Sequence, residues 1–535
     1  MSRLAGPVLL CALAAGFVPA RHAAAAETAP TAAPARAIGV AEAVAMALEK
    51  NENIYVQREQ LLSAGEAVNG AKGAYDPFLE AAAGWREATQ PLNSAFSITP
   101  DGEPAPTTTD ANFAASISQL LPTGGAVTLH VSTDRAWSDN TVDLLAPAYG
   151  AQTGVEFRQP LLRDLMIDPA RVALRVTAAD HSRAEASLRR EVIETTASVE
   201  TVYWLWVAAG RAISALEESV RLAEQQLEQT GLRIDAGTAP KAEISQPRAE
   251  LERRRGDLLE MRQNSLRAEH ALKRLILSET DPLWNEPLAP ADDPQVTIVP
   301  VDADAAVAQA LQQRPELAEA SAVIDGRRAE TEGAKNAVRP ALDAVLSYDR
   351  FGLTGRANPN TVTFPGVPDE LPDGVEGDWR SSLENLLEPD FDDFRGGLVF
   401  RIPIGNRSAR AAAAIAESNE RQADASLAFI SKTVRVEVLD AAAALQTAGQ
   451  RIEAFAAARE AAEVQLSAEQ DRYGAGLSTN FLVLTRQNDL SRARLDEIGA
   501  LTDYRRALTE LARATGTLLE QRGIAVAAAP AGDPQ

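Results

Sequence analysis

The sequence is short of the residues on which most enzyme sites and disulfide frameworks depend. Its single cysteine is Cys11, and its four histidines, His22, His130, His181 and His270, stand apart without the spacing of metal ligands. It also lacks a glycine-rich phosphate loop and the paired motifs of nucleophilic catalysis. We therefore expect no disulfides, no metal site, no cofactor and no enzymatic activity.

Long hydrophobic runs are also missing. After the N-terminus, no stretch approaches the roughly 18 apolar residues that a transmembrane helix needs. Residues 1–26 carry the positive Arg3 near their start, a short apolar core at 8–18 and a run of alanines at their end. This pattern predicts a cleaved secretory signal peptide. If the secreted chain enters a membrane, it must do so as a closed β-barrel. The net charge of −23 argues against nucleic acid as a partner.

The chain contains an internal repeat. GAKGAYDPFL at 70–79 returns as GAKNAVRPAL at 333–342, and RIDAG at 233–237 returns as RYGAG at 472–476. The second pair lies 24 positions closer together than the first, so the first copy holds a longer internal segment. The repeat predicts a first copy at 27–282, a linker at 283–302, a second copy at 303–522 and a disordered tail at 523–535.

The constant part of each copy is helical by its period. Hydrophobic residues recur every seven positions from Val192 to Ile234, a seam over six heptads that is typical of coiled coils. Long helices are predicted near 170–232 and 408–471, each about 90 Å long at the usual helical rise. Shorter helices are predicted near 40–75, 241–277, 303–338 and 480–517, and two of them end to end could match a long one. The helices alone would also fit a soluble coiled-coil rod.

The variable part of each copy predicts β-strands, at 78–160 and at 342–403. Apolar and polar residues alternate there over segments of about ten residues, as they do around Leu129, and a membrane strand requires this pattern. Pro77 and Pro340 precede the two strand regions and cannot continue a helix interior, so they mark helix-to-strand breaks.

The second strand region also contains an acidic loop at 353–393. Its part at 369–393 holds ten acidic residues and the single base Arg380. We interpret the segment as a solvated loop outside the cell, and bridging by divalent cations is the alternative.

Several segments resemble the TolC family of outer-membrane efflux channels. They are RYGAGLSTNFLVLTRQNDLSRARL at 472–495, GLRIDAGTAPKAEISQPRAEL at 231–251, QPLLR at 159–163 and IPIGNRSARA at 402–411. The resemblance covers nearly all of the mature chain. It implies a mainly α protein in which long coiled-coil helices form a trimeric α-barrel tunnel, joined to a trimeric outer-membrane β-barrel. Each chain of the family usually gives four strands; here LPTGG at 121–125 predicts an extra hairpin, hence four to six strands, with the hairpin either in the wall or projecting from it.

The resemblance also assigns roles to two glycine turns, at 231–240 and 471–480. In the family these turns form the periplasmic tip that docks an adaptor protein, which in turn connects to an inner-membrane transporter. By position, the docking residues are Ala236, Gly237, Thr238, Ala475, Gly476 and Leu477. Each glycine also fits an ordinary helix C-cap, and both interpretations can hold.

A closed aperture near the tip is a further implication of the resemblance. Tyr473 matches the family's gating tyrosine and Glu243 matches its carboxylate, so we expect a hydrogen bond between them in the closed trimer. Ser478 stands where the family has an arginine. Leu482 and Thr485 stand where some members have aspartates, so an acidic cation-binding ring is not expected.

As a whole, the resemblance implies the exit duct of a tripartite efflux pump or a type I secretion system, in the outer membrane of a Gram-negative bacterium. Such a duct is passive and depends on the adaptor, the inner-membrane transporter, outer-membrane lipid and its own homotrimer. A periplasmic coiled-coil scaffold without transport activity and an outer-membrane channel outside any pump are the alternatives. The alternating strands favour the duct over the scaffold.

Overall fold

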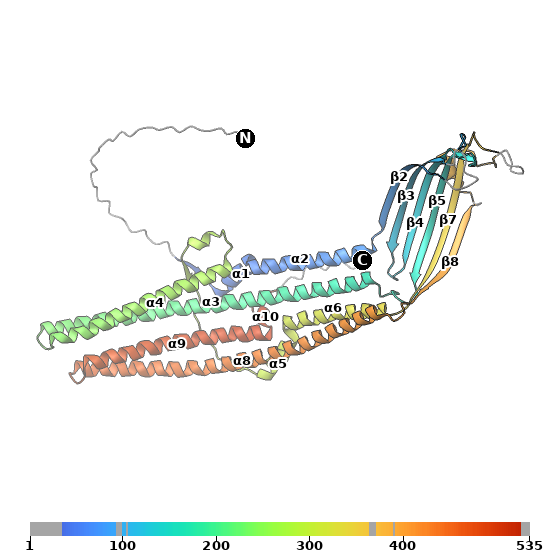
Figure 1. Cartoon of the computed structure of the whole chain (residues 1–535). Helices are drawn as coiled ribbons and strands as arrows, with labels where there is room; N and C mark the ends of the chain where they lie inside the picture. Colours follow the sequence, from blue (N-terminus) through green and yellow to red (C-terminus); the bar gives the residue numbers. More distant parts are fainter. Residues whose placement is uncertain (1–34, 92–98, 103–104, 363–370, 389–390, 526–535) are drawn as a thin grey trace, which may run out of the picture.

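A computed structural model of the chain describes residues 35–91, 99–102, 105–362, 371–388 and 391–525. Two helical hairpins run side by side, and a sheet stands at the end of the molecule opposite the hairpin tips (Figure 1). The signal peptide expected at 1–26 and residues 526–535 of the expected tail lie outside the described residues. Of that tail, Ile524 is described, and it packs against the core.

Two very long helices set the length of the molecule. α3 (Pro169–Asp235) has 67 residues and α8 (Arg407–Gly474) has 68, so each spans about 100 Å. α3 begins where Pro169 occupies the first turn and the Asp168 carboxylate accepts a hydrogen bond from the Arg171 amide, 3.0 Å away. Both helices run a few residues further toward the tip than the heptad pattern predicts.

Shorter helices pack along the two long ones. In the first copy α2 (Glu52–Lys72) covers the sheet half of α3 and α4 (Ser245–Ile276) covers the tip half (Figure 1). In the second copy α6 (Pro315–Ala337) and α9 (Asn480–Thr515) cover α8 in the same way. Within the described part of the chain, no helix has both the length and the apolar composition that crossing a bilayer requires.

The helices predicted at 40–75 and 303–338 are each interrupted. Asn51 separates α1 (Val40–Lys50) from α2, and Arg314 separates α5 (Ala303–Gln313) from α6, at equivalent positions of the repeat. The Asn51 side chain accepts hydrogen bonds from the amides of Asn53 and Ile54, which begins a new helix. At Arg314 the cause is the following proline, which disfavours a helical conformation in the residue before it.

Six antiparallel strands form one sheet. Its order is β2 (Phe78–Thr89), β3 (Thr107–Leu120), β4 (Ala126–Ser138), β5 (Leu145–Pro160), β7 (Ala341–Ala357) and β8 (Asp392–Arg401). The hairpin β3–β4 therefore lies within the sheet and does not project from it. Pro77 and Pro340 each stand directly before a strand, β2 and β7.

The acidic segment expected as one loop at 353–393 contains regular structure. β7 continues to Ala357, β8 begins at Asp392, and a short helix, α7 (Trp379–Asn385), lies between them. Residues 363–370 and 389–390 lie outside the described part. The Asp378 carboxylate caps α7 by accepting from the amides of Arg380 and Ser381.

Two apolar cores hold the helices together near the middle of the molecule. Ile38, Val199, Trp206 and Leu272 are buried between α1, α3 and α4, whereas Val438 and its neighbours are buried between α5, α8 and α9. Two further elements close the first core: β1 (Arg36–Ile38) pairs in parallel with β6 (Leu288–Pro290). Short 3₁₀ turns complete the chain, η1 (Gly73–Tyr75), η2 (Lys241–Ile244) and η3 (Pro282–Asn285), together with α10 (Leu518–Gln521).

The heptad seam predicted from Val192 to Ile234 is buried over only part of its length. Val192, Val199 and Trp206 are buried, but further toward the tip Val220 and Leu227 are only half-buried. Residues three positions after those of the seam, among them Ala223 and Thr230, are buried there instead. One chain therefore leaves an apolar stripe of α3 partly uncovered.

Two tyrosines of the long helical part form hydrogen bonds to the linker at 283–302, which connects the two copies of the repeat. The Tyr203 hydroxyl of α3 lies 2.7 Å from the Asp292 carboxylate and 3.0 Å from the Ile38 carbonyl. Burial and the hydrogen bond with Asp292 raise the pKa of Tyr203, so this hydroxyl stays protonated. On α9, the Tyr504 hydroxyl accepts from the Val299 amide at 2.9 Å.

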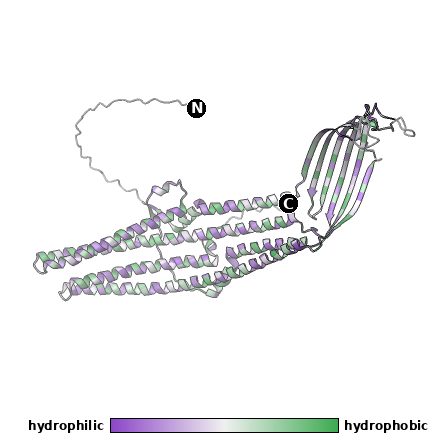
Figure 2. Cartoon of the chain, in the orientation of Figure 1, coloured by the Kyte–Doolittle hydropathy of each residue, from purple (hydrophilic) through white to green (hydrophobic). Residues whose placement is uncertain are grey.

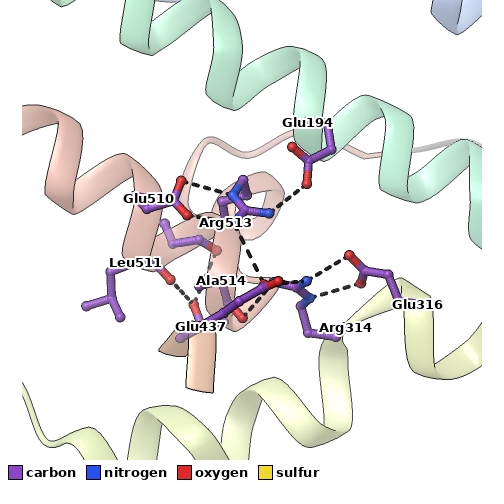
Figure 3. A network of polar contacts seen from close by, with 10 residues as sticks. Glu194, Arg314, Glu316, Glu437, Glu510, Leu511, Arg513 and Ala514 are labelled. Atoms are coloured by element: carbon purple, nitrogen blue, oxygen red, sulfur yellow. Dashed lines mark hydrogen bonds and ion pairs between the residues drawn. The ribbon is translucent and has the colours of Figure 1, made fainter. Parts of the chain in front are cut away.

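A network of arginines and glutamates joins the two copies of the repeat near the middle of the molecule (Figure 3). The buried Arg314 donates to both oxygens of Glu316 at 2.8–2.9 Å, to Glu437 of α8 at 2.9 Å and to the Ala514 carbonyl of α9 at 3.2 Å. Arg513 of α9 pairs with Glu194 of α3 at 2.7 Å. Hydrogen bonding to Glu510 and the charge of Glu194 raise the pKa of Arg513, although burial opposes this.

Removing the centre of this network tests its contribution to stability. We expect Arg314→Ala to lower the free energy of unfolding by about 1.5–3 kcal/mol, because two carboxylates and a carbonyl lose a charged donor. Arg262→Ala is the matched control, since its 2.8 Å ion pair with Glu217 also joins two helices but lies half in solvent. That variant should change stability by less than about 1 kcal/mol. Thermal unfolding in detergent compares the two, and equal losses would contradict the role of the network.

Candidate functional site

The two tip turns have the same backbone geometry. Gly237 and Gly476 adopt positive φ angles of 72° and 77°, the left-handed conformation that glycine tolerates best. At the first turn, the Thr238 amide donates to the Arg233 carbonyl at 2.9 Å and the Gly237 amide donates to the Ile234 carbonyl at 3.0 Å. The second turn repeats both bonds at 2.8 and 3.1 Å. Both long helices thus end in a Schellman motif, which satisfies their last carbonyl groups.

The expected docking residues form the exposed end of each hairpin. Ala236, Gly237 and Thr238 are exposed on the first turn, and Ala475, Gly476 and Leu477 are exposed on the second. Leu477 is the large apolar side chain of the second turn, and it is 73% exposed. Both turns lie at the end of the molecule farthest from the sheet (Figure 1).

The expected gating tyrosine contacts the other hairpin of its own chain. Arg233 of α3 donates to the Tyr473 hydroxyl of α8, and its guanidinium carbon lies 5.0 Å from the centre of the tyrosine ring. The contact combines a hydrogen bond with a cation–π interaction. The internal repeat pairs Arg233 with Arg472 but gives Arg233 no role. The contact of Arg233 with Tyr473 depends on the hairpins lying side by side, which the sequence does not specify.

Glu243 and Ser478 lie elsewhere on the tip. Glu243 is exposed in η2, and within the described part of the chain its carboxylate has no hydrogen-bond or ion-pair partner. Ser478 donates to the Glu469 carboxylate of α8. Arg233 occupies only an acceptor site of the Tyr473 hydroxyl, so the hydroxyl proton is still able to bond a carboxylate of another chain. The Glu243–Tyr473 bond stays a prediction about the assembled protein.

Buried amides join the two hairpins just behind the tip, a feature that the sequence pattern did not indicate. The Gln226 amide of α3 donates to the Asn480 side-chain oxygen of α9 at 2.6 Å. Asn480 also lies 3.5 Å from the Thr230 hydroxyl. Gln226, Thr230 and Asn480 are all at least 90% buried, so these groups fix how the hairpins align.

The sheet has one apolar face and one polar face. The hydropathy alternates along the strands (Figure 2), and the strand register places most of their large apolar residues on the same side. Phe78, Phe351, Leu353 and Val399 lie on the other side. Large side chains on this face are exposed: Leu79, Trp85, Phe113, Ile117, Leu129, Leu346, Tyr348, Phe394, Leu398 and Phe400. A continuous apolar surface of this extent indicates a partner or an apolar medium.

The opposite face carries charged side chains that pair across strands. Asp343 of β7 accepts from Arg158 of β5 at 2.6 Å and from Arg401 of β8 at 2.8 Å. His130 of β4 lies 2.9 Å from Asp349 of β7. Such a face suits contact with water. Among the described residues, no cluster of three His, Cys, Asp or Glu side chains could hold a metal ion.

Comparison with known proteins identifies relatives of this architecture. A family model described as outer membrane efflux protein matches residues 109–276 and 306–517, more than half of the chain. Comparison with curated proteins gives no match.

Solved channels have a similar fold. The chain is 15% identical to the CmeC outer membrane channel of Campylobacter jejuni, with a TM-score of 0.61 over 90% of this chain and 86% of CmeC. For the outer membrane protein VceC of Vibrio cholerae the values are 16%, 0.61, 89% and 96%. For the open state of the MtrE outer membrane channel of Neisseria gonorrhoeae they are 15%, 0.59, 90% and 89%. The fold extends over nearly the whole of each of these proteins.

The conformation of the second turn can be tested with two alanine substitutions. Gly476→Ala should destabilise the tip by about 1–2 kcal/mol, because a Cβ is strained at positive φ. Gly474→Ala, in the last turn of α8, places its Cβ in open space and should be neutral or stabilising by up to about 1 kcal/mol. Amide hydrogen exchange of the tip peptides measures both effects. Equal exchange in the two variants would show that the turn does not require glycine at 476.

Proposed function

Because this chain belongs to the outer membrane efflux protein family, we propose that it is the exit duct of a tripartite efflux pump or a type I secretion system. The family consists of channel proteins of the outer membrane and not of enzymes. In this role a homotrimer conducts substrates passively across the periplasm and the outer membrane. The observation that carries the proposal is the two-faced sheet at one end of two hairpins about 100 Å long.

The sheet supports closure with two further copies. β2 and β8 are its outer strands, and the antiparallel order would place β8 of one copy antiparallel to β2 of the next. Three six-stranded sheets would then make a barrel of 18 strands, with the apolar face toward lipid. A barrel of about this size encloses an aqueous channel, and here the charged face would line it. The extra hairpin β3–β4 would thus widen the exit.

The helical part supports a tunnel with a docking tip. Large apolar side chains remain exposed along the hairpins, among them Leu259 (64%) and Phe429 (70%). Neighbouring copies would cover such side chains and close the ring of helices. The exposed turns at Gly237 and Gly476 would then meet the hairpins of a periplasmic adaptor, which links the duct to the inner-membrane transporter that supplies the energy.

Co-purification tests the proposed function. Detergent extracts of the outer membrane should yield a trimer that carries the adaptor. Leu477→Asp should reduce the amount of adaptor recovered, because it replaces the exposed apolar contact of the tip with a charge. Gly474→Ala is the control and should recover the adaptor normally. If native mass spectrometry detects a monomer without detergent, and that monomer is fully helical, the proposed duct is wrong and a periplasmic scaffold is favoured. A trimer with no adaptor would indicate a channel outside any pump.

The proposal extends to the aperture. Tyr473 is held by Arg233 in its own chain, and its hydroxyl proton would be donated to Glu243 of a neighbouring copy. A hydrogen bond to a charged group contributes about 1.5–3 kcal/mol, and the exposure of the tip favours the lower value. Three such bonds would bias the trimer toward its closed state. Ser478 cannot supply the charge of an arginine, so the closed state depends more on this pair.

Conductance in planar bilayers tests the aperture. Tyr473→Phe and Glu243→Gln should each raise the conductance, because the first removes the donor of the bond and the second removes the negative charge of its acceptor. The double variant should add little to either single variant, since the two residues act through the same contact. Tyr473→Phe keeps the ring that stacks on Arg233, so it isolates the hydroxyl. Unchanged conductance in both single variants, or additive effects in the double variant, would show that this pair does not hold the aperture.

A further inference from the structure

α7 packs on the apolar face of the sheet, at the end away from the helices. Thr354 and Ala151 share that face with Leu346 by strand alternation, and they are only 0% and 5% exposed because α7 covers them. The Thr354 hydroxyl donates to the Asp378 carbonyl at 2.8 Å. A Cβ at Gly352, on the same face, would collide with the Ser382 carbonyl, so the helix lies directly against the strand.

The sheet covers only part of the apolar side of α7. At 100° per residue, Ser382 and Leu386 lie on one edge of the apolar arc, and both are buried. Trp379 and Leu383 continue the arc within α7, and Leu387 follows in the turn after the helix; Trp379 and Leu387 are 54% and 80% exposed. The side of α7 turned away from Ser382 carries Arg380 and Glu384, and Glu388 follows the helix. A short amphipathic helix thus presents an apolar stripe to the surroundings of the sheet.

Side chains next to α7 mark a boundary on the same face. Arg350 of β7 lies on the same face as Tyr348 by strand alternation, and it donates to the Glu388 carbonyl that follows α7. Two residues before Arg350 in β7, Tyr348 pairs with Phe394 of β8. These two residues are 39% and 71% exposed. Aromatic rings beside a charge are typical of the level at which the apolar layer of a membrane meets its headgroups.

We infer that α7 is an interfacial anchor that lies in the headgroup boundary of the outer leaflet. Its stripe of Trp379, Leu383 and Leu387 would contact the acyl chains, and its charged arc would face the headgroups and water. The apolar stripe is continuous with the apolar face of the sheet, which supports lipid as the occupant over another protein. The inference rests on the proposed function, because it requires that this face of the sheet meets lipid.

Site-directed spin labelling tests the anchor. Cys11 is the only cysteine of the sequence and lies in the signal peptide that is expected to be removed, so a single introduced cysteine would be the one thiol of the secreted protein. The variants are Trp379→Cys on the apolar stripe, Glu384→Cys on the charged arc, Phe394→Cys on the sheet and Leu477→Cys at the tip. Each trimer is reconstituted into vesicles of phosphatidylethanolamine and phosphatidylglycerol. Relaxation by oxygen, which partitions into lipid, is compared with relaxation by a water-soluble nickel chelate.

We expect oxygen to dominate at positions 379 and 394 and the nickel chelate to dominate at 384 and 477. Leu387→Cys should behave as Trp379→Cys does, and it replaces that variant if loss of the tryptophan prevents folding. A water profile at both 379 and 387, with a lipid profile at 394, would overturn the anchor and leave the channel intact. A water profile at 394 itself would overturn the proposed function.

Discussion

The outer edges of β2 and β8 present rows of backbone amide and carbonyl groups that no strand covers in the described part of a single chain. In an apolar medium each such group costs several kcal/mol when unpaired, more than most side-chain contacts supply. Backbone pairing with further copies is therefore the requirement from which the proposed assembly follows. In the proposed assembly it would fix which strands meet, and the alternation along them would then turn the apolar side chains outward and the charged ones inward.

The internal repeat solves a related problem in the helical part. A helix about 100 Å long needs cover on each side, and one hairpin partner reaches only part of the way. Each copy therefore stacks two shorter helices along one long helix, with a break at Asn51 or Arg314 where they meet. Buried side chains fill the two breaks. The Asn51 side-chain amide donates to the Leu275 carbonyl near the end of α4 at 3.1 Å, and Arg314 donates to Glu437 and to the Ala514 carbonyl near the end of α9 (Figure 3).

The patterns that repeat over many residues were enough to predict the long helices, the alternating strands and the glycine turns, because periodicity accumulates along a segment. The helix predicted at 303–338 runs through the break at Arg314, although Pro315 is a local signal for it. Asn51 has only a capping signal inside a continuous helical pattern. α7 has just seven residues, too few for a period to be recognised. The partner of Arg233 depends on the alignment of two hairpins some 240 residues apart, which no local pattern specifies.

The alignment of the two hairpins also orders Tyr473, a residue of the proposed aperture, within a single chain. The buried Gln226–Asn480 bond holds the hairpins together behind the tip, and Arg233 then meets Tyr473 across the same gap. With an acceptor site of the hydroxyl already occupied within the chain, its proton has fewer directions available, and the ring is restrained by stacking. A group ordered in this way loses less conformational entropy when a neighbouring carboxylate arrives. In the proposed trimer, a weak bond at an exposed tip would then bias the closed state although solvent competes for it.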